Sequence, residues 1–257
     1  MSVLSGHLLD MVSDGFWHGF IVFLRVGAFV SLMPAFGEAV VPTRVKVGIG
    51  FAFTLAIAPA VSISATPSQL NEYVSQALAE TVNGLLLGIG LRLFILALQT
   101  AGSIAAQSTS LSQILGGAAA EPVPAMGYIL VFAAFALAVT TGLHIKAAKL
   151  IIFSYQMLPI GTFPGATDLS FWGVHRVSQT FSLAFTLSAP FLVLSLLYNL
   201  ALGVINKAMP QLMVAFVGAP LITAGGLFIL CLSAPVLLQT WLHGLNSFML
   251  NPFQGQP

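Results

Sequence analysis

Long apolar stretches alternate with short polar connections along most of the chain, and Asp168–Arg176 is predicted to be one of these connections. Each stretch approaches or exceeds the roughly 20 residues that an α-helix needs to cross a hydrocarbon layer. Backbone groups in lipid must find hydrogen-bond partners within their own segment, so we predict helices for these stretches. The six stretches are Phe16–Phe36, Val47–Ile63, Thr81–Ala105, Met126–Leu143 continuing to Leu158, Val177–Ile205, and Gln211–Trp241.

Proline residues fall inside several of these stretches and predict bent helices. Proline removes a backbone donor and tends to kink or end a helix. The pattern Ser-Ala-Pro occurs in each of the last two stretches, at Ser188–Pro190 and Ser233–Pro235. We therefore predict a long antiparallel helix pair joined near 206–210. The predicted fold class is all-α and of the membrane class, with long, kinked apolar helices arranged as hairpins.

The composition supports an apolar environment for most of the surface. Charged residues make up 6% of the chain and apolar residues 58%, with a mean hydropathy of +0.99. A soluble domain carries about a quarter charged residues and avoids large exposed apolar patches. We expect the chain to lie in lipid, against other proteins, or both. A formal net charge of +1 provides no field that would attract nucleic acid.

The few charges and small residues inside the apolar stretches are candidates for helix pairing. Gly84 and Gly88 have the spacing that lets helix backbones approach, either within the chain or between chains. Arg25 and Arg92 interrupt apolar helices, where a cation is costly and is a functional candidate by default. Pairing with a carboxylate of a partner chain or with a backbone carbonyl is favoured for both over direct contact with a transported molecule.

The basic residues conflict with a model in which every stretch crosses the membrane once. Lysine and arginine favour the cytoplasmic side, which would place Arg44 and Lys46 inside. Lys146 and Lys149 would then fall outside. We therefore expect that some helices do not span, and that His144, Lys146 and Lys149 belong to a helix among partner proteins or above the bilayer.

Signatures of catalysis and of metal binding are missing from the sequence. It contains no H-E-x-x-H, G-x-S-x-G or Walker-type motif, and no histidine pair at the i, i+4 spacing of a helical metal site. We predict a protein that is not an enzyme and that uses no cofactor. A small-molecule or proton-coupled transporter using Arg92, His144 and Lys149 remains an alternative. Met209 and Met213 share a helical face, where ordinary packing is favoured over a flexible seal.

Four groups of residues follow one another in order along nearly the whole chain. They are Leu24–Phe29 with Met33–Gly37, Val41–Val47 and Ala58–Pro59; Glu80, Gly84, Gly88 and Leu91 with Ala97–Gly102; Thr141–His144 with Phe153–Ser154 and Leu158–Gly161; and Pro210–Met213 with Val217–Leu221. In their order and spacing, these groups resemble the FliR family of type III secretion export gate subunits, which includes injectisome counterparts.

The resemblance implies a non-enzymatic subunit of a helical export gate, with the flagellar system favoured over the injectisome. It implies a FliP-like portion at 1–160, a FliQ-like helical hairpin at 177–246, and assembly with FliP and FliQ homologues. Further implied partners are FlhA and FlhB homologues, unfolded export substrates and membrane lipid. The implied location is the bacterial inner membrane at the flagellar basal body, with part of the gate protruding on the periplasmic side.

The resemblance also implies roles for particular residues. The connection at 107–124 is similar to the segment that helps plug the closed pore, although it lacks the Gly-Leu-Ser-Phe stretch and Asp-Pro pair that relatives usually carry. The plug candidates are Gln107, Ser110, Leu115, Gly116, Gly117, Glu121 and Pro124. The assembly candidates are Arg25, Arg44, Lys46, Gly84, Gly88, Arg92, His144, Pro210, Gly218 and Pro220. A gasket role would fall on Met209 and Met213.

Overall fold

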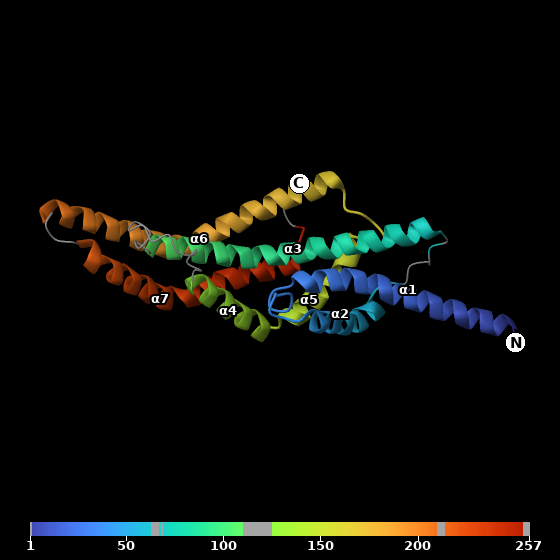
Figure 1. Ribbon diagram of the computed structural model, residues 1–257. Helices are drawn as coiled ribbons and strands as arrows, with labels where there is room; N and C mark the ends of the chain where they lie inside the picture. The colour runs from blue at the N-terminus through green and yellow to red at the C-terminus, as the bar shows by residue number, and fades with distance from the viewer. Residues whose placement is uncertain (1, 63–66, 68, 110–124, 210–213, 254–257) are drawn as a thin grey trace. The chain divides into compact units, whose positions relative to one another are not determined.

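The computed structural model describes residues 2–62, 67, 69–109, 125–209 and 214–253, and the described part is helical throughout its regular elements (Figure 1). Side chains are described from Val12 onward, except at 109, 125 and 214–220 within helices. The elements are α1 (Ser2–Leu32), α2 (Thr43–Ile57), the 3₁₀ turn η1 (Ala58–Ala60), α3 (Leu70–Thr109), α4 (Ala125–Thr140), α5 (Leu143–Met157), α6 (Ala166–Ala208) and α7 (Val214–Leu250).

The prediction of an all-α, membrane-class fold is confirmed. Among the described residues, five helices are long and apolar enough to cross a membrane, or six if a bent pair counts as one span. The bent pair is α4 with α5, which meet at an angle of 73°. Gly142 separates them with a φ of +81°, a left-handed conformation that glycine adopts at little cost.

Two helices are longer than the sequence pattern predicts. α3 begins at Leu70 and α6 at Ala166, so each starts about three turns before the predicted apolar stretch. The prediction of a polar connection at Asp168–Arg176 is wrong, because these residues form the first turns of α6. The segment contains no proline, and its polar side chains fit an exposed helix face, so polarity alone does not end the helix.

Prolines lie both at helix ends and inside helices. Pro34 follows the end of α1, and Pro59 lies in η1. Pro190 lies inside the 43-residue helix α6, and Pro235 lies inside α7. A proline inside a helix removes one backbone hydrogen bond, which surrounding contacts can compensate in apolar surroundings.

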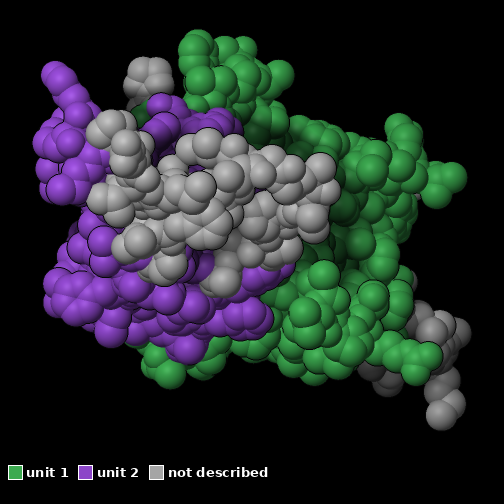
Figure 2. Space-filling view, turned by 60° about the vertical axis from the view of Figure 1, so that its left-hand side comes forward, with its two compact units in different colours: residues 1–92, 139–175, 246–257 green, residues 93–138, 176–245 purple. Residues whose placement is uncertain are grey.

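The chain divides into two compact units (Figure 2). Unit 1 comprises residues 1–92, 139–175 and 246–257, and unit 2 comprises residues 93–138 and 176–245. α3, α6 and α7 each contribute to both units. Three long helices therefore pass from one unit to the other without a break in their secondary structure.

Unit 1 has its core where α1 lies against the first half of α3. The buried residues of α1 include Val22, Val26, Phe29 and Met33, and those of α3 include Leu87 and Leu91. A Cβ atom at Gly84 would lie 2.2 Å from the carbonyl oxygen of Arg25, and one at Gly88 would lie 2.9 Å from Cβ of Leu32. The pair Gly84 and Gly88 thus brings α3 against α1 of the same chain, as small residues do between helices in an apolar solvent.

Unit 2 contains a second close approach of two backbones. A Cβ atom at Gly102 of α3 would lie 2.2 Å from Cα of Gly127 in α4. The indole nitrogen of Trp241 in α7 donates to the carbonyl oxygen of Phe94 at 2.9 Å, and Trp241 is fully buried. These contacts fix α3, α4 and α7 of unit 2 to one another.

We predict that Gly84→Ala destabilises the folded chain by about 1–3 kcal/mol, because the added methyl group must push α1 away from α3. The matched control is Gly19→Ala in α1, where nothing lies within 4 Å of the position that a Cβ would occupy. The control should be neutral or slightly stabilising, because alanine favours the helix over glycine. Thermal unfolding of the detergent-solubilised protein measures both, and equal unfolding temperatures for the two variants would contradict the packing described.

Candidate functional site

Arg25 forms a buried bidentate ion pair with Glu80. Both side chains are fully buried. Nε of Arg25 donates to one carboxylate oxygen at 2.8 Å, and a terminal guanidinium nitrogen donates to the other at 2.9 Å. The parallel geometry matches the planar guanidinium to the carboxylate and is the strongest form of such a pair.

Further contacts connect this pair to α5 and to the turn that follows it. The guanidinium also donates to the hydroxyl of Ser154 at 3.1 Å and to the carbonyl oxygen of Leu158 at 2.9 Å. The backbone N–H of Gly161 donates to the Glu80 carboxylate at 3.0 Å. The ring of Tyr155 lies 3.8 Å from the guanidinium carbon. We call Arg25, Glu80, Ser154, Tyr155 and Gly161 the Arg25 cluster.

The local structure explains why these groups meet. Gly161 has a φ of +77°, which turns the chain back toward α3 after α5 ends. Asn83, one turn after Glu80, donates to the carbonyl oxygen of Thr162 at 3.0 Å and is also buried. The Arg25 cluster therefore joins α1, α3, α5 and the α5–α6 turn at one buried point.

The electrostatics of the Arg25 cluster suit a structural role. Removing either charge from a buried pair leaves the other without compensation, at a cost of several kcal/mol. The guanidinium makes four hydrogen bonds within its own chain, so its donors are almost fully occupied. This arrangement resists displacement and leaves little donor capacity for a passing molecule.

A second ion pair fixes the connection between α1 and α2. Arg92 of α3 pairs with Glu38, and both side chains are partly exposed. Lys46 donates to the carbonyl oxygen of Gly37 at 2.8 Å. Ala35 has a φ of +66°, which is unusual for a residue with a side chain. The tight path of residues 33–42 is thus held from both α2 and α3.

The remaining predicted residues are dispersed. Arg44 on α2 and His144 and Lys149 on α5 are exposed, as are Gln107 near the end of α3 and Met209 after α6. Gly218 and Pro220 lie in α7, but their side-chain surroundings are not among those described. The predicted residues Ser110, Leu115, Gly116, Gly117, Glu121, Pro124, Pro210 and Met213 lie outside the described residues.

The residues of the transporter alternative are in separate surroundings. Arg92 is engaged by Glu38, whereas His144 and Lys149 project from the surface of α5. Across the part of the chain that the structure describes, no group of three or more histidine, cysteine, aspartate or glutamate residues could hold a metal ion.

The sequence singles out Arg25, but the expectation that its carboxylate partner comes from another chain is wrong, because Glu80 of the same chain supplies the carboxylate. The available signal was the position of Glu80 at the start of a long apolar stretch, because a buried acid requires an opposite charge. Ser154 and Gly161 carry no such signal, since their contribution depends on how α5 and its following turn return to α3.

A family model described as bacterial export proteins, family 1, matches residues 16–248. The chain is 33% identical over 225 residues to the flagellar biosynthetic protein FliR of Caulobacter vibrioides, covering 86% of this chain and 90% of that protein. It is 28% identical over 239 residues to the protein of the same name from Escherichia coli, covering 92% and 90%. The Bacillus subtilis protein of that name is 30% identical over 234 residues, covering 88% and 90%.

We predict that Arg25→Met or Glu80→Leu alone destabilises the chain by about 3–5 kcal/mol, because each leaves an uncompensated buried charge. The double variant Arg25→Met, Glu80→Leu should recover much of this loss, since it leaves no charge in the cluster. Arg92→Met is the matched control and should cost about 1 kcal/mol or less, because its pair with Glu38 is partly exposed. Thermal unfolding measures all four, and a double variant as unstable as the sum of the single variants would contradict the argument.

Proposed function

Because the chain belongs to the family of bacterial export proteins, family 1, we propose that it is the subunit of the flagellar export gate that forms, with FliP and FliQ homologues, a passage for unfolded flagellar proteins. The family match over residues 16–248 carries this proposal. The relatives named flagellar biosynthetic protein FliR favour the flagellar system. The chain is a flagellar export component of the inner membrane, and its partners and position within the gate are what we propose.

The distribution of apolar side chains supports assembly with other subunits. In an apolar 18-residue segment of α6, only 11% of the residues are buried within the chain. In the corresponding segment of α7, 22% are buried. Leu196, Leu200 and Val204 of α6 are each about two-thirds exposed, at 70%, 67% and 65%. Such faces require lipid or protein against them. We propose that FliQ-like hairpins of neighbouring subunits cover part of α6 and α7.

We further propose that residues 1–160 act as a FliP-like portion and residues 177–246 as a FliQ-like hairpin. A Cβ atom at Gly225 of α7 would lie 3.6 Å from Cδ2 of Leu194 in α6. This proximity supports a paired arrangement of the two helices. FlhA and FlhB homologues are the proposed neighbours at the cytoplasmic side.

Partial protrusion of the gate on the periplasmic side also belongs to the proposal. The 73° bend between α4 and α5 is unlike a straight crossing of a bilayer. α5 carries His144, Lys146 and Lys149 within its first two turns, and charged groups are costly in hydrocarbon. A helix of this kind is better placed among protein subunits above the bilayer.

The chemistry of the described residues supports a non-enzymatic role. The buried charged groups of unit 1 serve to join helices, as Arg25 and Glu80 do. We propose that the chain acts by assembly and gating and requires no cofactor.

We propose that residues 107–124 contribute to closure of the gate. The helices on either side, α3 and α4, touch at Gly102 and Gly127. Small residues such as Gly116 and Gly117 move at little steric cost, which suits a reversible closure.

We predict that an affinity tag on this chain recovers FliP and FliQ homologues from solubilised membranes, and that deletion of the chain abolishes motility. Expression of the wild-type chain in the deletion strain should restore both. A chain that restores motility but is recovered from the membrane without either homologue would contradict the proposed assembly.

We predict that deleting residues 116–120 makes cells permeable to ions and small solutes, because the closing segment becomes too short. Membrane potential and uptake of a small dye measure the leak. The control is the substitution Gln99→Ala at an exposed position of α3 outside the predicted plug segment. An unchanged permeability of the deletion variant in an assembled gate would contradict the closing role.

A further inference from the structure

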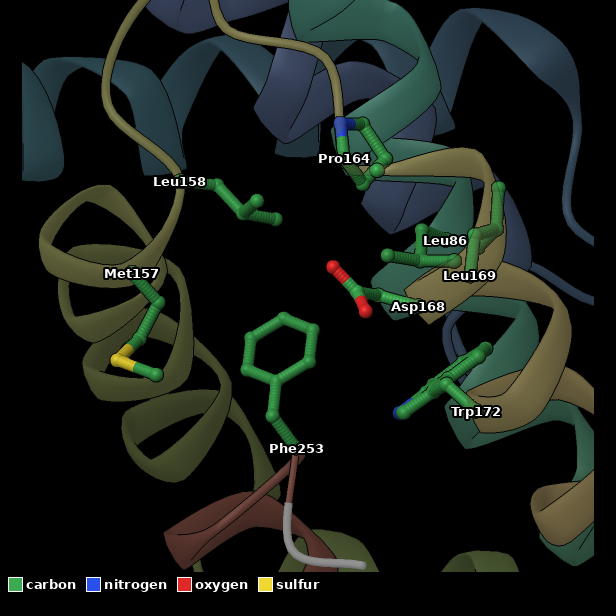
Figure 3. A pocket seen from close by; sticks show the side chains of 9 residues that line it. Leu86, Met157, Leu158, Pro164, Asp168, Leu169, Trp172 and Phe253 are labelled. Atoms are coloured by element: carbon green, nitrogen blue, oxygen red, sulfur yellow. The ribbon is translucent and has the colours of Figure 1, made fainter. Parts of the chain in front are cut away.

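A cavity of about 160 Å³ lies in unit 1 at the start of α6 (Figure 3). It is bounded by the end of α5, the α5–α6 turn, the first turns of α6 and the C-terminal segment after α7. We call it the Asp168 pocket. Its lining residues are Leu86, Met157, Leu158, Pro164, Gly165, Asp168, Leu169, Trp172 and Phe253.

The side chains that line the Asp168 pocket are apolar apart from the indole nitrogen of Trp172 and one carboxylate, and Asp168 itself is exposed in the single chain. Figure 3 shows the Asp168 carboxylate turned into the cavity, with the rings of Trp172 and Phe253 on nearby walls. The indole nitrogen of Trp172 donates to the carbonyl oxygen of Pro252 at 2.8 Å, and Trp172 is buried. This bond holds the indole ring of Trp172 against the backbone of the segment that carries Phe253.

The described residues provide no basic partner for Asp168. The ion pairs found among them join Arg25 to Glu80 and Arg92 to Glu38. A carboxylate beside apolar walls loses hydration when the opening is covered, and it then requires an opposite charge. A subunit that covered this opening would stabilise the carboxylate by bringing a cation with it.

Asp168 also has an ordinary role at the start of α6. A carboxylate in the first turn of a helix interacts favourably with the helix dipole. Its Oδ2 atom lies 2.8 Å from the position of a Cβ at Gly165, so only glycine fits there without a shift. This role explains why an acid stands at the helix start, but it does not explain the anchored indole ring of Trp172 or the cavity in front of the carboxylate.

We propose that the Asp168 pocket receives one lysine or arginine side chain from a neighbouring subunit of the export gate. A long aliphatic stem would pack on Met157 and Leu158 while its charged end reaches the carboxylate. The faces of Trp172 and Phe253 attract a cation in addition. The inference rests on the proposed function, since it requires a neighbouring subunit.

A basic side chain fits this pocket better than a lipid headgroup does. An ethanolamine headgroup carries an ammonium group but also a phosphate a few bonds away. In a cavity of about 160 Å³ the phosphate would lie near the Asp168 carboxylate and be repelled by it. Lysine and arginine carry the same kind of cation without an adjacent anion.

Site-specific photocrosslinking in the assembled gate tests the proposal. Benzoylphenylalanine replaces Phe253, which lines the pocket, or Phe171, an exposed residue of α6 that does not line it. After irradiation of solubilised gates, the crosslinked peptides are identified by mass spectrometry. We expect the probe at 253, but not the probe at 171, to reach a partner segment with a lysine or arginine within a few residues of the crosslink.

Charge reversal provides the second arm of the test. Asp168→Lys should lower the crosslink yield per assembled chain by about tenfold, since like charges would meet, whereas Asp168→Glu should retain most of it. Changing the mapped basic residue of the partner to glutamate should restore the yield with Asp168→Lys. A role confined to the helix start predicts no such rescue, because the partner's charge would not affect α6.

The outcomes separate this inference from the proposed function. The pocket assignment would be overturned by crosslinks to lipid alone or to a segment without a basic residue. It would also be overturned if Asp168→Lys left the crosslink yield undiminished, or if the charge change in the partner failed to restore the yield. If FliP and FliQ homologues are still recovered with the probe at 171, the proposed function stands in each of these cases. If no homologue is recovered even with the wild-type chain, the proposed function and the inference both fail.

Discussion

The fold of unit 1 depends on one buried ion pair in a chain that has almost no charge to spare. Arg25 and Glu80 are fully buried, and their pairing joins α1 to α3. Hydrogen bonds between this pair and Ser154, Leu158 and Gly161 bring α5 and its following turn to the same point. Because apolar packing has little directional preference, such a pair supplies register among helices that could otherwise slide. The specificity of a buried pair comes from the cost of leaving either charge unpaired.

Close backbone contacts complete this arrangement. Gly84 lets α3 approach the carbonyl of Arg25 itself, so the ion pair and the glycine contact lie on the same stretch of α1. Gly102 and Gly127 do the same for α3 and α4 in unit 2. Much of α6 and α7 is left without partners in the chain. A polypeptide with a well-fixed interior and large uncovered apolar faces is suited to be one part of a larger assembly, which agrees with its membership of an export family.

The sequence predicts the helical, membrane-class fold well, because long apolar stretches leave few alternatives in lipid. It also singles out Arg25, since a cation within an apolar helix demands a partner. It does not predict Glu80 as that partner or the role of Gly161, because both depend on contacts between segments far apart in the chain. The polar composition of Asp168–Arg176 led to a predicted connection where α6 continues, since local polarity does not reveal whether one helix face is exposed. Assembly roles of residues such as Arg44 and Pro210 remain predictions.

The most direct test of the account compares how accessible α6 is to lipid in the assembled gate and in the isolated chain. A cysteine placed at Leu200, in a background with Cys231→Ser, would be labelled with a maleimide that partitions into the hydrocarbon of reconstituted vesicles. Leu200 is 67% exposed in the single chain, so the isolated chain should react readily. The account predicts protection of this cysteine when FliP and FliQ homologues are present. Equal labelling in both preparations would contradict the claim that sister subunits cover these helices.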